Sequence, residues 1–113
     1  MTEIWHNPRC SKSRQTLAIL EDRGEDVTVR RYLDDPPDAG ALRSVLTALG
    51  VAPIELVRTG EKTFKELGLS KDSPDDELIA AMVSHPILIE RPVVIKNGKA
   101  RIGRPPESVI DIL

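Results

Sequence analysis

The sequence predicts an α/β protein in which a mixed four-stranded sheet carries helices on its faces. Three observations predict this class. An apolar run, a helical run and a β-branched run follow one another within residues 2–32. Segments with the helical spacing of apolar residues then occupy about residues 36–84. Near the C-terminus, Asn97-Gly98 separates two β-rich runs, which is a strong signal for a hairpin.

The N-terminal part predicts a parallel strand–helix–strand unit. Thr2–Trp5 is short and apolar and precedes the turn signal Asn7-Pro8, so we expect a buried strand there. A residue before proline avoids helical geometry, which places the start of the helix near residues 10–11. Gly24 marks the end of this helix, and Val27–Tyr32 alternates as a second strand. We expect a right-handed crossover between the two strands.

Four helices are predicted in the middle of the chain. The first is amphipathic over about residues 41–49 and is closed by Gly50. Two short helices are expected at about residues 53–56 and 61–67. The fourth follows Ser73-Pro74, with serine as the cap, proline at the first helical position and acidic residues in the first turn.

The C-terminal part predicts a hairpin and a last helix. The hairpin pairs Val93–Lys96 with Lys99–Ile102. The helix begins at Pro105, and its expected apolar face is Val109, Ile110 and Leu113. This order of elements predicts a thioredoxin-like fold, as a single domain over residues 1–113. The helical insertion, about residues 36–84, lies between the second strand and the hairpin.

Composition narrows the classes of function. The chain has 113 residues, of which 40% are hydrophobic and 30% charged, with a net charge of −2, so no basic field suggests nucleic acid. No apolar run approaches the length of a membrane span, and the N-terminus lacks a signal-peptide pattern. We therefore expect a cytoplasmic, monomeric protein with no membrane partner. One cysteine and two histidines exclude an internal disulfide and make a structural metal site improbable.

Cys10 is the candidate nucleophile. It lies at the junction of a strand and a helix, where free N–H groups and the helix dipole stabilise an anion. Its neighbours are polar or cationic: His6 could donate to the sulfur, and Arg14 adds charge. Arg9, Lys12, Ser11 and Ser13 supply further charges and hydroxyl donors. The setting predicts a thiolate at neutral pH, whereas the alternative is a small buried hydrophobic residue.

Three arginines are candidate ligands for an oxyanion. They are Arg58, Arg91 and Arg104, each next to a predicted element boundary. The planar guanidinium suits a tetrahedral oxyanion, although each could instead be a surface arginine. The predicted fold brings the Arg91-Pro92 turn against Cys10, and it favours a cis bond before Pro92.

The motifs resemble those of the ArsC family of glutaredoxin-dependent arsenate reductases. The active-site loop His6–Leu17 carries the resemblance. Further matching blocks are Leu56–Thr59, Lys65–Leu69, His85–Val94 and Gly98–Glu107. The resemblance therefore covers essentially the whole chain. Within the family, the chain is similar to the YfgD-like branch.

This resemblance implies a mechanism for arsenic detoxification. Cys10 would form a covalent bond to arsenic, glutathione would act as co-substrate, glutaredoxin would resolve the intermediate, and no cofactor would stay bound. Arg58, Arg91 and Arg104 would hold the oxyanion. His6 would help to lower the pKa of Cys10, and Ser13 would hydrogen-bond its sulfur.

Two other functions are compatible with the sequence. One is a glutathione-dependent thiol oxidoreductase that acts on a different substrate. The other is an RNA polymerase-binding regulator similar to Spx proteins, which share this fold. Spx proteins carry a Cys-X-X-Cys switch, whereas this chain has Ser13 at the second position. The loop also differs from the Ala-Cys-Gly-Thr-Ser-Arg of better-characterised arsenate reductases, because Ser11-Lys12 follows the cysteine.

Overall fold

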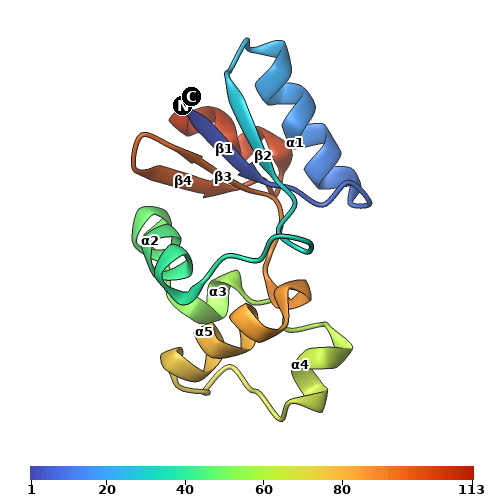
Figure 1. Cartoon of the computed structure of the whole chain (residues 1–113), viewed down its shortest axis with the longest axis vertical. Helices are drawn as coiled ribbons and strands as arrows, with labels where there is room; N and C mark the ends of the chain where they lie inside the picture. Colours follow the sequence, from blue (N-terminus) through green and yellow to red (C-terminus); the bar gives the residue numbers. More distant parts are fainter. The chain divides into compact units, whose positions relative to one another are not determined.

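A computed structural model describes all 113 residues and divides them into two compact units (Figure 1). The first unit joins Met1–Asp35 to Arg91–Leu113, and the second is Pro36–Glu90. The predicted helical insertion falls inside the second unit, which extends to Glu90 because a 3₁₀ helix, η1 (Pro86–Leu88), follows its last α-helix.

The first unit is built on a four-stranded mixed sheet with the strand order β2-β1-β3-β4 (Figure 1). The strands are β1 (Thr2–Trp5), β2 (Val27–Arg30), β3 (Val93–Lys96) and β4 (Lys99–Ile102). β1 pairs in parallel with β2 and antiparallel with β3, which pairs antiparallel with β4. The predicted α/β class, the parallel crossover and the hairpin are all confirmed.

Helix α1 (Ser11–Asp22) and the 3₁₀ helix η2 (Pro106–Ile112) complete the first unit. The core joins sheet and helices through Ile4, Leu20, Val94, Val109 and Ile112, all of them buried. Ile4 and Val94 are cross-strand partners and so share one face of the sheet. Since side chains of α1 and η2 pack on these two residues, this face forms the core.

The last helix differs from the expectation. It is a 3₁₀ helix, and its buried residues are Pro106, Val109 and Ile112, whereas Ile110 is 38% exposed. A 3₁₀ helix has three residues per turn, so side chains three apart eclipse one another on one face. The predicted face of Val109, Ile110 and Leu113 was therefore wrong at Ile110, because the apolar spacing of three was read as α-helical.

The second unit contains four α-helices and η1. They are α2 (Ala39–Leu49), α3 (Pro53–Leu56), α4 (Lys62–Glu66) and α5 (Asp75–Ser84). Gly50 ends α2 in the left-handed conformation, with a φ of 70°, as its position predicted. No helix in the structure combines the length and the apolar character that crossing a membrane would require.

Two helix starts differ from the predicted ones: α2 begins about two residues earlier than predicted, and α5 begins one residue later. Asp38 caps α2 by accepting from the Ala41 N–H at 2.8 Å. At α5 the cap residue is Pro74, and the hydroxyl of Ser73 instead accepts from the N–H of Ser70 at 2.9 Å. Ser73 thus stabilises the turn before the helix.

Candidate active site

One edge of the sheet collects the loops that carry the candidate residues of the first unit. Trp5, at the end of β1, pairs with Val93 at the start of β3, and Val93 pairs with Ile102 at the end of β4. The segments that begin with His6, end with Pro92 and begin with Gly103 therefore meet at this edge. β2 is parallel to β1, so Arg31 leaves the sheet at the same edge.

Cys10 is the N-cap residue of α1 and is half-buried. A turn from Asn7 to Cys10 precedes the helix. It is closed by the Cys10 N–H, which donates to the carbonyl of Asn7 at 3.0 Å. Burial raises the pKa of the Cys10 thiol, but four other influences outweigh it. The backbone N–H of Ser13, the charge of Arg91, the N–H of Lys12 and the charge of Arg104 together hold the pKa below its ordinary value of 9.0.

Arg104 reaches the sulfur directly. Its Nη2 lies 3.7 Å from Cys10 Sγ, while its Nε donates to the carbonyl of Arg91 at 2.9 Å. The peptide bonds Arg91–Pro92 and Arg104–Pro105 are both cis. The first of these was expected from the fold, and the second was not. The guanidinium of Arg104 thus contacts both the sulfur of Cys10 and the backbone of Arg91.

Gly103 allows this close approach. Its N–H donates to the carbonyl of Pro92 at 2.9 Å. A Cβ atom there would lie 2.5 Å from Thr16 Oγ1 and 2.7 Å from Pro92 Cγ, which is closer than real contacts allow. Only glycine fits between Thr16 of α1 and the Pro92 turn, and Arg104 follows it immediately.

His6 and Ser13 interact with each other. His6 Nδ1 lies 2.6 Å from Ser13 Oγ, which also accepts from the N–H of Asn7 at 3.0 Å. Ser13 Oγ thus has His6 and Asn7 as its partners, and the contact of Ser13 with Cys10 is made by its backbone N–H. This differs from the expectation that the side chains of His6 and Ser13 would contact the thiol.

His6 is a buried side chain whose lowered pKa favours the neutral imidazole. Burial lowers its pKa, and the nearby charges of Arg31 and Arg14 lower it further. A neutral imidazole adds no positive charge for the thiolate. Arg14, also expected to act on the thiol, uses Nη1 to donate to the carbonyl of Pro8 at 2.9 Å, so it supports the loop before Cys10.

Arg58 belongs to the second unit and is not among the residues that the first unit brings to Cys10. It lies between α3 and α4, where its Nη1 pairs with Glu61 Oε1 at 2.6 Å and its N–H donates to the carbonyl of Leu88. The ion pair fixes one side of the guanidinium.

The sequence did not identify several positioning residues. Gly103 and Thr16 lack a distinctive local pattern, because their roles arise from contacts between distant segments. Asn7 offered a signal, since Asn-Pro marks a turn: its Oδ1 accepts from the N–H of Arg9 at 3.0 Å. No three His, Cys, Asp or Glu side chains gather where they could hold a metal ion.

Comparison with known proteins decides the family. The model of the ArsC family matches residues 5–112. The chain belongs to the ArsC family. This confirms the family resemblance that the motifs predicted.

ArsC-family relatives align over nearly the whole chain. YfgD of Escherichia coli K12, an uncharacterized protein, is 52% identical over 113 residues, which cover 98% of this chain and 95% of YfgD. A protein of Neisseria meningitidis serogroup B named arsenate reductase is 46% identical, covering 98% and 97% of the two chains.

Solved ArsC-family structures share the fold. The arsenate reductase from Vibrio cholerae superimposes with a TM-score of 0.96 at 47% identity, covering 99% of this chain and 97% of that one. The predicted thioredoxin-like fold is thereby confirmed. In chemical terms, the candidate site combines a thiol of lowered pKa with a guanidinium at the sulfur, an arrangement suited to attack on an anion.

Proposed function

We propose that this protein reduces arsenate to arsenite and that Cys10 is its nucleophile. The observation that carries the proposal is the 3.7 Å approach of Arg104 Nη2 to Cys10 Sγ, at a thiol of lowered pKa. A thiolate and arsenate are both anions and repel one another unless a cation lies between them. Relatives at 44–46% identity that are named arsenate reductases support the same substrate.

The first step forms a covalent intermediate. The Cys10 thiolate attacks arsenic(V), a sulfur–arsenic bond forms, and one arsenic–oxygen bond breaks. The departing oxygen takes up protons from solvent and leaves as water. Arg91 and Arg104 stabilise the charge on the remaining oxygens, and Arg58 is proposed as the third ligand of the oxyanion.

The following steps need thiols from outside, because Cys10 is the only cysteine in the chain. Glutathione adds to arsenic and displaces a second oxygen as water. A glutaredoxin thiolate then attacks the glutathione sulfur, and the bonding pair of the broken sulfur–arsenic bond stays on arsenic. Arsenic(V) becomes arsenic(III), while the two external thiols become a mixed disulfide. Water finally releases arsenite and restores the Cys10 thiol.

A coupled assay tests this proposal. NADPH consumption is followed with arsenate, glutathione, glutaredoxin and glutathione reductase. We expect Cys10→Ser to lower the rate at least about 1000-fold, because a hydroxyl is a far poorer nucleophile at neutral pH. Ser44→Ala, at an exposed position of α2, is the control and should keep the full rate. An active Cys10→Ser variant would refute the proposal.

The oxyanion ligands are tested through the KM for arsenate. We expect Arg91→Gln, Arg104→Gln and Arg58→Gln each to raise it by about 10-fold or more, since each loses one charge-assisted contact. Arg23→Gln, at the exposed end of α1, should leave it unchanged. An arginine whose replacement leaves both KM and kcat unchanged is removed from the site.

Location and assembly are part of the same proposal. We propose a cytoplasmic monomer that acts without a nucleic acid partner, on the grounds of its charge balance and its scattered exposed apolar residues. Light scattering after size-exclusion chromatography should give the mass of one chain, 12.5 kDa, and a doubled mass would contradict the monomer.

A further inference from the structure

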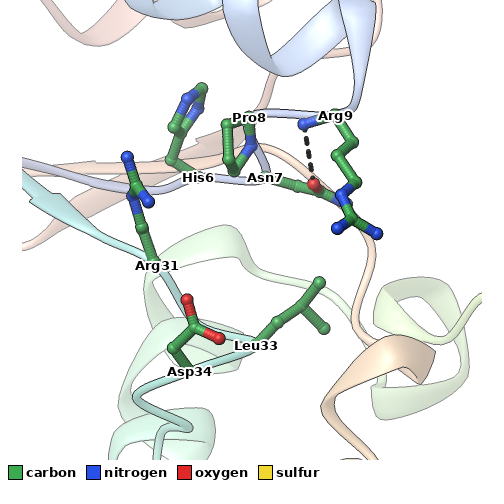
Figure 2. Close-up of a pocket in the computed structure, with 7 residues that line it drawn as sticks. All are labelled: His6, Asn7, Pro8, Arg9, Arg31, Leu33 and Asp34. Carbon is green, nitrogen blue, oxygen red and sulfur yellow. Dashed lines mark hydrogen bonds between the residues drawn. The ribbon is translucent and has the colours of Figure 1, made fainter.

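A polar pocket lies beside the turn that delivers Cys10, wholly within the first unit (Figure 2). Its volume is about 320 Å³. Figure 2 shows the loop residues His6, Asn7, Pro8 and Arg9 above Arg31, Leu33 and Asp34, with the imidazole of His6 turned away from them. This volume is at the lower end of the range for small-molecule sites, which is about 300–1000 Å³.

Hydrogen bonds hold both walls of the pocket in place. In the turn, the Asn7 side chain accepts a hydrogen bond from the Arg9 N–H, and Arg14 donates one to the carbonyl of Pro8. On the opposite wall, the N–H of Asp34 donates to the Arg31 carbonyl at 3.0 Å. The pocket is therefore formed before any ligand binds, which lowers the entropic cost of binding.

Three charged side chains of the pocket have no partner in the protein. No hydrogen bond or ion pair engages the guanidinium of Arg9, the guanidinium of Arg31 or the carboxylate of Asp34. The adjacent pair behaves differently: Arg30 Nε lies 3.5 Å from Asp35 Oδ2. The pocket thus presents two cations and one anion that could interact with a ligand.

These charges match one class of molecule. A ligand with two carboxylates and one ammonium would place a carboxylate on each guanidinium and its ammonium on Asp34. A peptide of about three residues spans about 10 Å when extended, and the pocket volume suits that size. Glutathione has these three charged groups and carries a thiol between them.

The pocket is also lined by residues that immediately precede Cys10 in the chain. Asn7, Pro8 and Arg9 line it, and the same four-residue turn ends at Cys10, whose N–H bonds back to Asn7. The first and last Cα atoms of such a turn lie within about 7 Å of one another. Cys10 does not itself line the pocket, but its Cα atom lies within about 7 Å of that of Asn7, which does.

We propose that this pocket binds the glutathione that adds to the Cys10–arsenic intermediate. The inference rests on the proposed function, since it assigns a place to the thiol that the reaction requires. Arg9 and Arg31 hold the two carboxylates, Asp34 holds the α-ammonium, and the cysteinyl group points toward arsenic. Arg9 and Arg31 are then binding residues for the co-substrate, distinct from the arginines that hold arsenate.

Direct binding tests this site without turnover. The probe is S-methylglutathione, which has no free thiol, titrated into the full chain by NMR or calorimetry. We expect Arg9→Gln and Arg31→Gln each to weaken binding by about 5- to 30-fold, through the loss of one guanidinium–carboxylate contact. Arg23→Gln, an exposed arginine outside the pocket, should bind as the unsubstituted protein does.

The ammonium contact has its own test. We expect Asp34→Asn to weaken binding of S-methylglutathione but not of the analogue that lacks the α-amino group, since only the first carries the cation. Asp26→Asn is the matched control, outside the pocket. Equal effects of Asp34→Asn on both analogues would overturn the assignment of the ammonium.

The two proposals fail in different ways. If S-methylglutathione does not bind, or if Arg23→Gln weakens binding as much as Arg31→Gln, the pocket assignment is wrong whatever the enzyme does with arsenate. If the probe binds as expected but arsenate is not reduced, the proposed function fails and the thiol site stands. Cys10→Ser should abolish turnover and keep the binding of the probe.

Discussion

At the scale of single residues, the Ser13 N–H and the charges of Arg91 and Arg104 act on the Cys10 thiol and lower its pKa. Cys10 lies at the start of α1, as the sequence predicted, and its pKa is lowered. The sequence could not show which neighbour acts on the sulfur, because His6, Ser13 and Arg14 all lie within reach along the chain. Which atom faces the sulfur depends on the turn and on α1, and there it is the Ser13 N–H.

The Cys10 thiol should make stability depend on pH. Burial opposes the shift of its pKa, while the Ser13 N–H and the charges of Arg91 and Arg104 produce it. Between the lowered pKa and 9.0, the unfolded chain keeps a proton that the folded protein has lost. The free energy of unfolding therefore rises with pH across this window, and the gain is lost as the pH falls through the folded pKa.

Removing one charge should reduce this effect. We expect Arg104→Gln to raise the thiol pKa, read from the pH profile of alkylation by iodoacetamide, and to flatten the rise in stability measured by urea denaturation. Arg23→Gln should change neither profile. A thiol pKa that stays the same or falls in Arg104→Gln would contradict the role given to this charge.

His6 should act through its hydrogen bond and not through charge. Asparagine can place a polar atom near Nδ1, so we expect His6→Asn to keep the bond to Ser13 Oγ and an unchanged thiol pKa. His6→Ala leaves Ser13 without this partner and should cost about 1–3 kcal/mol of stability. If His6→Asn raises the thiol pKa as much as His6→Ala does, the imidazole contributes charge and the interpretation is wrong.

Gly103 should be intolerant of a side chain. We expect Gly103→Ala to cost about 1–3 kcal/mol, because its Cβ would collide with Thr16 and Pro92. Moving this segment shifts Arg104 from the sulfur, so the thiol pKa should also rise. Gly60→Ala, where a Cβ meets nothing within 4 Å, is the control. Urea denaturation and alkylation profiles measure both effects, and a Gly103→Ala variant equal to Gly60→Ala would contradict them.

At the scale of elements, local signals predicted the strands well and the last helix poorly. Asn97-Gly98 joins β3 and β4 as its turn chemistry requires, with positive φ angles of 52° and 77°. β2 ends at Arg30, two residues before the predicted end, although Tyr32 beyond it is buried. Alternation indicates where side chains are covered, but pairing with β1 decides where a strand stops.

The two isoleucines of η2 test its 3₁₀ geometry. Ile112 is 8% exposed and lies in the core, whereas Ile110 is 38% exposed. We expect Ile112→Ala to cost about 2–4 kcal/mol and Ile110→Ala less than about 1 kcal/mol, both measured by denaturation. The α-helical face predicted from the sequence requires the larger loss at Ile110, so the ranking of the two variants decides between the helices.

At the scale of the whole molecule, local charge and net charge have opposite signs. The chain has 16 basic and 18 acidic residues and a net charge of −2, which would repel an anionic substrate. The field at the sulfur is set instead by the nearby charges of Arg91 and Arg104. At physiological salt, dissolved ions screen the exposed charges that lie more than about 8 Å away. This local field was not visible in the composition, since it depends on the sheet edge that gathers the two arginines.

Cys10 reports on this field without interference, because the chain has no other thiol. We expect it to prefer anionic iodoacetate over neutral iodoacetamide by about 3- to 10-fold more than free cysteine does at low salt. The preference should shrink as sodium chloride is added, because salt screens the guanidinium charges. It should shrink also in Arg104→Gln but not in Arg23→Gln. A ratio equal to that of free cysteine, or independent of salt, would mean that the net negative charge outweighs the arginines and that the edge does not attract anions.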